Sequence, residues 1–293
     1  MPTVEKRTIT PRAQTRQKRP ETREEKMIAA LSPNLNVMVE AVRRAGHNLI
    51  RDFGEISSLQ VSQKGPGDFV SNADIMAEKN LISYLKEARP DYAFLSEECG
   101  ELKPEHNSRM KWVIDPIDGT TNFLHAIPEF ALSVSLLDGD EVIAGVIYNP
   151  ITNELYYAEK GQGAFLMTPN GNRRLRVSGR SKLAHALLCS NAFGYPKSRD
   201  VIIKASGKVA SVRYNGSTTL ALASVAAGKM DAYIACRFKL WDVAAGYLII
   251  KEAGGFVSDF DHNRNLFDIV KSQTIVATTM GLKDDFLKIV EGK

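Results

Sequence analysis

The sequence lacks several features that would mark particular protein classes. No apolar run approaches the roughly 20 residues that a membrane-spanning helix needs, which argues against a membrane protein. Only three cysteines occur, Cys99, Cys189 and Cys236, and they form no C-x-x-C pair, so neither a zinc knuckle nor a disulfide framework is indicated. The N-terminus has no apolar segment typical of a secretory signal. We therefore expect a protein of a reducing compartment, the cytoplasm, with no membrane partner.

The body of the chain also lacks an excess charge of either sign. Residues 1–26 contain eight basic and four acidic side chains, which account for the whole net charge of +4. A body designed to bind nucleic acid is therefore not indicated. Residues 1–30 are polar and poor in large apolar side chains, and we expect them to form a disordered basic extension. A contact of this extension with RNA or an acidic surface stays open.

Apolar residues make up 44% of the whole chain, and their periodicity divides the sequence after the extension into two parts. Residues 34–53 have helical spacing, and a second helix is predicted to open within 68–74, with Ile75, Leu81, Ile82 and Leu85 on its core face. Alternation then predicts strands at 130–137 and 142–148 joined by a hairpin at 138–140, further strands at 155–158 and 164–166, and an edge strand at 174–177. Strands and helices alternate after that. The order predicts an α+β subdomain over 31–180 and an α/β subdomain over 181–293.

The most informative segment is DPIDGTTN, at residues 115–122. Asp115 and Asp118 follow an apolar, strand-like run, where aspartate is unfavourable unless it binds something positive. The ion that best suits carboxylate oxygens is a hard divalent cation. Gly119 allows the backbone to approach a ligand closely, and a helix that starts after it would offer amides to an anion. A metal ion beside a phosphate is our first interpretation, and a simple Asp/Gly turn is the alternative.

Three further acidic residues stand where apolar segments begin or end. Glu97 follows the short apolar run at 92–95, and Asp74 lies at the start of a predicted helix. Asp242 begins another helix, in the sequence WDVAAG. Such positions are usual for ligand-binding residues in layered α/β folds. Taken alone, Asp242 fits a helix N-cap better than a ligand.

Together these motifs resemble the inositol monophosphatase family of magnesium-dependent, lithium-sensitive phosphatases. The resemblance is carried by Glu97-Glu98, by DPIDGTTNF from Asp115, and by Trp241-Asp242 with AAG after it. The segments 216–228 and 252–255 agree with it, so that it covers residues 35 to about 290. It implies a layered α-β-α-β-α sandwich of the sugar phosphatase type, a homodimer, and Mg²⁺ as cofactor.

The resemblance also implies roles for individual residues. One magnesium ion would be held by Glu97, Asp115 and the carbonyl of Ile117, and a second by Asp115, Asp118 and Asp242. Thr120, paired with Asp74, would position the attacking water together with Glu97. The substrate-binding positions would be Ile117, Asp118, Gly119, Thr120, Arg213 and Asp242, with the amides of Gly119 and Thr120 at the phosphate. Four carboxylates in one place could not all stay ionised without cations between them.

One position departs from the family pattern. Ala235 stands seven residues before Asp242, where members that act on inositol phosphate usually carry a glutamate that binds sugar hydroxyls. Arg237 and Lys239 follow closely and, with Arg213, predict a preference for a sugar phosphate or a doubly phosphorylated molecule over myo-inositol 1-phosphate. The alternative for Arg237 and Lys239 is a pair of solvated surface charges. Two alternatives stay open: a 3′(2′),5′-bisphosphate nucleotidase, and a relative that also binds RNA or the transcription machinery.

Overall fold

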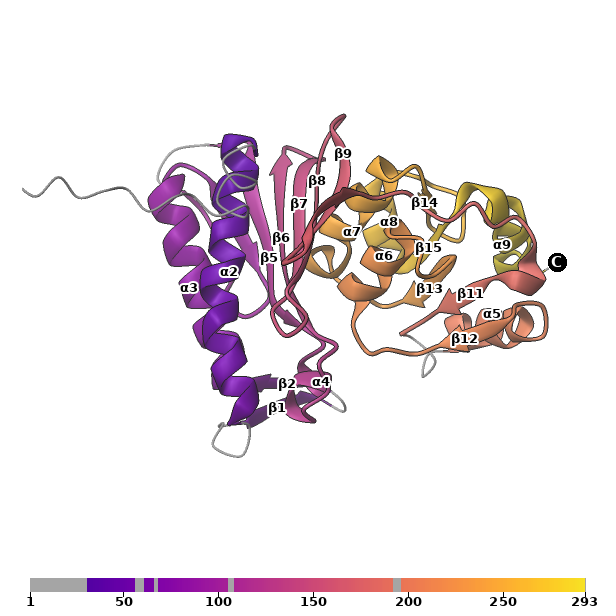
Figure 1. Cartoon of the computed structure of the whole chain (residues 1–293), viewed down its shortest axis with the longest axis horizontal. Helices are drawn as coiled ribbons and strands as arrows, with labels where there is room; N and C mark the ends of the chain where they lie inside the picture. Colours follow the sequence, from indigo (N-terminus) through magenta and orange to yellow (C-terminus); the bar gives the residue numbers. More distant parts are fainter. Residues whose placement is uncertain (1–30, 56–60, 66–67, 105–107, 192–195, 293) are drawn as a thin grey trace, which may run out of the picture.

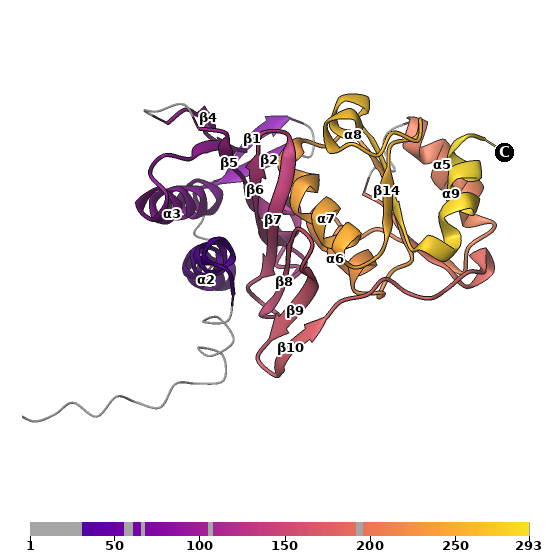
Figure 2. The ribbon, with the colours of Figure 1, turned by 90° about the horizontal axis from the view of Figure 1, so that it is seen from above.

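The structure is a computed structural model that describes residues 31–55, 61–65, 68–104, 108–191 and 196–292 (Figure 1). The predicted basic extension at 1–30 lies outside the described residues. The elements stack in five layers, in the order helices, sheet, helices, sheet, helices (Figures 1 and 2). This confirms the predicted α-β-α-β-α sandwich.

The first helical layer consists of α2 (Pro33–Gly54) and α3 (Asn72–Ala88). α2 confirms the predicted first helix and buries Leu35, Met38 and Val42. The second helix begins at Asn72, inside the predicted segment 68–74, but residues 68–71 form the strand β2 (Asp68–Ser71), which was not predicted and pairs with β1 (Val61–Gly65). Ser71 then caps α3.

The predicted core face of α3 was wrong at one position. Ile75 is 38% exposed, whereas Leu81 and Leu85 are buried as expected and Ile82 is partly buried. The buried face includes Asp74 and Glu78, which the apolar pattern did not count as core positions. Two acidic side chains therefore point from α3 into the protein.

The second layer is an eight-stranded sheet in the order β10-β9-β8-β7-β6-β5-β3-β4. All neighbours are antiparallel except β3 and β5. The hairpin predicted at 138–140 is confirmed, with Asp138 opposite Glu141. The predicted edge strand at 174–177 was displaced, because the edge strand ends at Arg174. The strands are β3 (Ala93–Ser96), β4 (Gly100–Leu102), β5 (Met110–Asp118), β6 (Ala131–Asp138), β7 (Glu141–Asn149), β8 (Glu154–Glu159), β9 (Gly163–Thr168) and β10 (Gly171–Arg174).

Small residues allow the central helical layer to fit between the two sheets. An added Cβ at Gly145 would lie 3.0 Å from the Cα of Ala245, so α7 packs directly on β7. Gly246, next in sequence, faces Leu222 of α6. The helices of this layer are α6 (Thr218–Ala226), α7 (Leu240–Glu252) and α8 (Leu266–Ser272).

The fourth layer is a five-stranded sheet in the order β12-β11-β13-β15-β14, and α5 and α9 cover its outer face (Figure 1). The members of these two layers are β11 (Leu187–Cys189), β12 (Ser211–Arg213), β13 (Ala232–Cys236), β14 (Phe256–Ser258), β15 (Thr274–Thr278), α5 (Pro196–Ser206) and α9 (Lys283–Val290). Short helical turns are α4 (Thr120–Leu124), η2 (Leu183–His185) and η3 (Met280–Leu282).

One hydrophobic core joins both halves of the chain. Val113 and Ile147 of the first sheet share it with Leu222 of α6 and Ile275 of the second sheet. The sheets divide between 174 and 187, but the central helices pack on both. The division into subdomains 31–180 and 181–293 therefore stays a prediction. None of the described helices combines the length and apolarity needed to cross a bilayer.

Candidate metal and phosphate site

A bulge in β5 brings Asp115 and Asp118 to the same face of the first sheet. Asp115 lies opposite Ser133 of β6 and Asp118 opposite Ala131, so three steps along β5 match two along β6. Residues two apart on a strand share a face, and directly opposite residues do too. The extra residue therefore aligns two side chains whose spacing would otherwise place them on opposite faces. Pro116 suits this position because it has no amide for the ladder.

Asp115 is buried among other carboxylates. Its side chain is 1% exposed, and its Oδ1 has no hydrogen-bond partner among the residues that the structure describes. Burial raises the pKa of Asp115 well above its usual value, and the charges of Glu97, Asp118 and Asp242 raise it further. A buried anionic oxygen without a partner is costly unless a cation balances it. The sequence-predicted acidic residues are thus close enough to influence one another.

Asp118 links the first sheet to the start of α6. Its Oδ2 accepts hydrogen bonds from the hydroxyls of Ser217 and Thr219, the latter at 2.6 Å, and from the amide of Thr219 at 2.7 Å. Its Oδ1 accepts from the amide of Thr218 at 3.2 Å. Burial raises the pKa of Asp118, while these hydrogen bonds oppose the rise. Asp118 therefore supplies a negative charge to the N-terminus of a helix from a distant part of the chain.

Asp242 lies three positions after the N-cap Lys239, not at the N-cap that its sequence context favoured. Its Oδ2 accepts a 2.6 Å hydrogen bond from the amide of Lys239. Burial raises the pKa of Asp242 to about 7, with a further contribution from the charge of Asp118. Both carboxyl groups therefore lie beside the starts of central-layer helices, close enough for the charge of Asp118 to raise the pKa of Asp242.

The predicted metal ligands are neighbours, but they do not form a ready coordination shell. In the described part of the chain, no three acidic, histidine or cysteine side chains are arranged to hold one ion as they stand. The physical reason is visible in the hydrogen bonds: Asp118 is turned toward α6, and Asp242 toward the amide of Lys239. Cation binding would require these oxygens to be shared or to turn.

Thr120 and Asp74 form the pair that the family resemblance implied. The Thr120 hydroxyl lies 3.1 Å from Oδ1 of Asp74 and 3.0 Å from the carbonyl oxygen of Ile117. Oδ2 of Asp74 accepts from the amide and hydroxyl of Ser71, at 2.8 and 2.6 Å. Burial raises the pKa of Asp74, and the hydrogen bonds from Ser71 and Thr120 oppose this. Asp74 therefore fixes the Thr120 hydroxyl over the bulge.

Gly119 makes the tight turn between β5 and α4. Its φ is +94°, and an added Cβ would lie 3.0 Å from the carbonyl oxygen of Glu129. A side chain here would therefore be strained by the backbone conformation and would contact that carbonyl oxygen tightly. Thr120 begins α4, and the first amides of any helix have no partner within that helix. This arrangement is compatible with the predicted phosphate contact.

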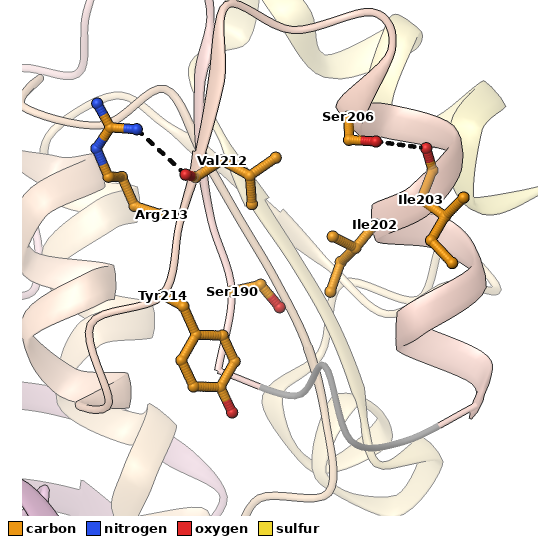
Figure 3. Close-up of a pocket in the computed structure, with 7 residues that line it drawn as sticks. All are labelled: Ser190, Ile202, Ile203, Ser206, Val212, Arg213 and Tyr214. Carbon is orange, nitrogen blue, oxygen red and sulfur yellow. Dashed lines mark hydrogen bonds between the residues drawn. The ribbon is translucent and has the colours of Figure 1, made fainter.

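Arg213 borders a cavity that none of the predicted metal ligands lines. It borders a space of about 680 Å³ between α5 and β12, with Ile202, Val212 and Tyr214 (Figure 3). Its guanidinium contacts its own strand, including the carbonyl oxygen of Val212 at 3.2 Å. The lining residues include none of the predicted metal ligands. The substrate-binding role of Arg213 therefore remains a prediction, because this cavity does not connect Arg213 to the predicted metal ligands.

Sequence reasoning assigned no role to several residues around the site, although Asn122 and Ser217 lie within the motifs that it used. Ser217 and Thr219 bond Asp118, and the side-chain amide of Asn122 joins the carbonyls of Glu129 and Asn215, both at 2.7 Å. These partners lie up to 101 positions apart, so no local pattern could reveal them. Glu78 was missed as well, although it lies one helical turn after Asp74.

The raised pKa of Asp242 predicts how pH changes the stability of the metal-free protein. The group keeps its proton up to about pH 7 in the folded state, but loses it near its ordinary value of 3.8 when unfolded. Folding stability should therefore fall by up to a few kcal/mol as pH rises from about 4 to 7. Urea unfolding in chelator should show this fall in the parent and a shallower one in Asp242→Asn. Equal slopes would contradict it.

Comparison with known proteins agrees with this architecture. The model of the inositol monophosphatase family matches residues 30–292. The inositol-1-monophosphatase of Mesorhizobium japonicum is 46% identical, covering 89% of this chain and 97% of that protein. A Xylella fastidiosa protein named Nus factor SuhB is 40% identical, over 78% of this chain and 82% of that protein.

A solved structure is similar over nearly its whole length. The extragenic suppressor protein suhB from Bartonella henselae superposes with a TM-score of 0.84 and 41% identity, covering 89% of this chain and 99% of that one. The layered fold, the order of the acidic motifs and these matches lead to one conclusion: the chain belongs to the inositol monophosphatase family.

Proposed function

We propose that this protein is a Mg²⁺-dependent phosphomonoesterase that hydrolyses inositol monophosphate or a related sugar or polyol phosphate. One observation carries the proposal. Asp115 has a buried oxygen without a partner in the described structure, and its pKa is raised by the charges of Glu97, Asp118 and Asp242. Such a cluster is suited to a hard divalent cation, which would remove the repulsion.

The donor set fits magnesium by its chemistry. All of the groups are oxygens, the kind of ligand that Mg²⁺ prefers, and no sulfur or imidazole is among them. When bound, Mg²⁺ would neutralise phosphate charge and acidify a bound water. The residues that would hold it are Glu97, Asp115, Ile117 through its carbonyl, Asp118 and Asp242.

The chain itself would orient water and phosphate. The Thr120 hydroxyl has one proton to donate, to Asp74 or to the carbonyl of Ile117, so its lone pairs can accept a hydrogen bond from water. Glu97 would accept a hydrogen bond from the other hydrogen of that water. The amides of Gly119 and Thr120 would hold the phosphate in line. Catalysis would then consist of positioning and charge neutralisation, with no covalent nucleophile on the protein.

Phosphate release from a panel of esters tests the proposal. The panel contains inositol 1-phosphate, sugar phosphates, a polyol phosphate and adenosine 3′,5′-bisphosphate, each with Mg²⁺ or with chelator. We expect Mg²⁺-dependent hydrolysis of a monoester and none by Asp118→Asn. Hydrolysis that chelator does not change would refute the metal-dependent mechanism. Preference for the bisphosphate would instead support the nucleotidase alternative.

The same panel tests substrate selectivity. Ala235 is 3% exposed at the end of β13 and can offer no hydrogen bond to a sugar hydroxyl from its side chain. Losing a charge-assisted hydrogen bond costs about 1.5–3 kcal/mol when nothing replaces it. We therefore expect a lower kcat/KM for inositol 1-phosphate than for the best substrate. An equal or higher value would contradict this expectation.

A second function is favoured by the relatives named Nus factor SuhB. We propose, as an additional role, binding of RNA or the transcription machinery, to which the basic residues 1–26 would contribute by charge. Deleting residues 1–26 should weaken RNA binding in a gel-shift assay and leave phosphate release unchanged. Unchanged RNA affinity would exclude a role of this segment.

A cytoplasmic homodimer is also proposed, and light scattering of the purified protein tests the dimer.

A further inference from the structure

Glu78 of α3 holds the turn that carries Glu97. Its side chain is 4% exposed, and its Oε1 accepts hydrogen bonds from the Ser96 hydroxyl and from the amides of Glu98 and Cys99, at 2.9 and 3.3 Å. The donors belong to Ser96, Glu98 and Cys99, which lie on both sides of Glu97 in the sequence. One buried carboxylate oxygen therefore fixes the chain on both sides of Glu97.

The first sheet fixes the same turn from the opposite direction. Glu97 follows β3, which runs parallel to β5, and its amide donates to the carbonyl of Ile114 at 3.3 Å. Ile114 immediately precedes Asp115. The backbone of Glu97 is therefore held between β5 and α3, next to the carboxylate with which it interacts.

The same helix also fixes Thr120. Asp74 and Glu78 are four residues apart on the buried face of α3, so they project from adjacent turns in the same direction. Asp74 accepts from the Thr120 hydroxyl at 3.1 Å, whereas Glu78 accepts from the Glu97 turn. α3 thus sets the position of Thr120 relative to that of Glu97.

We propose that Glu78 is a positioning residue, which aligns Glu97 with Thr120 for the reaction by holding the turn at 96–99. The catalytic role of Glu97 in this proposal rests on the proposed function. The hydrogen bonds by which Glu78 holds the turn do not depend on it. Partners that orient a metal ligand typically change metal affinity or activity 10- to 100-fold when they are mutated. The acceptor oxygen is the feature required, so glutamine should replace glutamate.

The test compares Glu78→Ala, Glu78→Gln and Ser96→Ala with a control, Glu87→Ala, which changes an exposed glutamate of the same helix. Mg²⁺ alone is titrated into metal-free protein by calorimetry, well below the unfolding temperature. Hydrogen exchange of the amides of Glu98 and Cys99 is followed by NMR, and kcat and KM are measured separately.

We expect Glu78→Ala to weaken Mg²⁺ binding and lower kcat about 10- to 100-fold, with a smaller change in KM and fast exchange at the two amides. Glu78→Gln should stay near the parent, and Ser96→Ala should lie between. The proposal would be overturned if Glu78→Ala had the same Mg²⁺ affinity and kcat as the control. It would also be overturned if Glu78→Gln and Glu78→Ala lost Mg²⁺ affinity and kcat equally. If Glu78→Ala does not fold, unchanged Mg²⁺ affinity in Ser96→Ala overturns it.

The two proposals fail in different ways. A parent protein without Mg²⁺-dependent phosphate release refutes the proposed function, while protected amides at 98 and 99 that depend on Glu78 still support the positioning of the turn. A parent that hydrolyses esters normally, with a Glu78→Ala variant that does so equally well, refutes the positioning role alone.

Discussion

Asp115→Asn is expected to lower kcat by about 1,000-fold or more while making the metal-free protein more stable. The carboxylate is the shared member of both predicted ligand sets, so losing its negative charge would weaken the binding of the cations that would neutralise the phosphate charge. In the metal-free protein the same charge is unfavourable, because burial and three acidic neighbours raise the pKa of Asp115. Removing it should therefore relieve repulsion, a trade of stability for function.

Two measurements check this result. Thermal unfolding in chelator should give a higher Tm for Asp115→Asn than for the parent, and adding Mg²⁺ should raise the Tm of the parent only. Asp138→Asn is a matched control, since the side chain of Asp138 is 44% exposed at the far end of β6, where it pairs with Arg109. Activity like the parent's in Asp115→Asn would refute the assignment of Asp115.

Gly246→Ala is expected to destabilise the protein by about 2 kcal/mol, although alanine is the better helix former by about 1 kcal/mol. An added Cβ would lie 2.5 Å from Cβ of Leu222 and 2.6 Å from its Cδ1. Because Cβ of Leu222 is fixed to its own helix, α6 and α7 would have to separate. Gly246 is one turn after Asp242, so the shift should also lower kcat.

The control for Gly246→Ala is a glycine-to-alanine substitution at a helix position where an added Cβ meets no neighbouring atom. Gly54 is the last residue of α2, and an added Cβ there would meet nothing within 4 Å. Gly54→Ala should leave stability unchanged or raise it by about 0.5–1 kcal/mol. Urea unfolding of both variants gives the comparison. Equal effects in the two variants would contradict the packing argument.

Much of the site could be predicted from local sequence because its chemistry is local. The motif at 115–122 combines acidic, glycine and hydroxyl residues within one turn, and the Thr120–Asp74 pair was expected from the family resemblance. The bulge could not be predicted, because it depends on how β6 is aligned with β5. Nor could the bonds of Asp118 to Ser217 and Thr219, which join segments about 100 residues apart.

The sequence by itself predicted which acidic residues would lie together and where most strands and helices run, because periodicity, turn residues and acidic motifs are properties of neighbouring positions. It could not determine which oxygens are buried, shared or left without a partner. Only the tertiary structure decided that Asp115 and Asp118 share a face, that Asp118 faces α6, and that Glu78 holds the turn of Glu97. Each of these depends on packing between layers, since burial and long-range hydrogen bonds exist only once the layers are assembled.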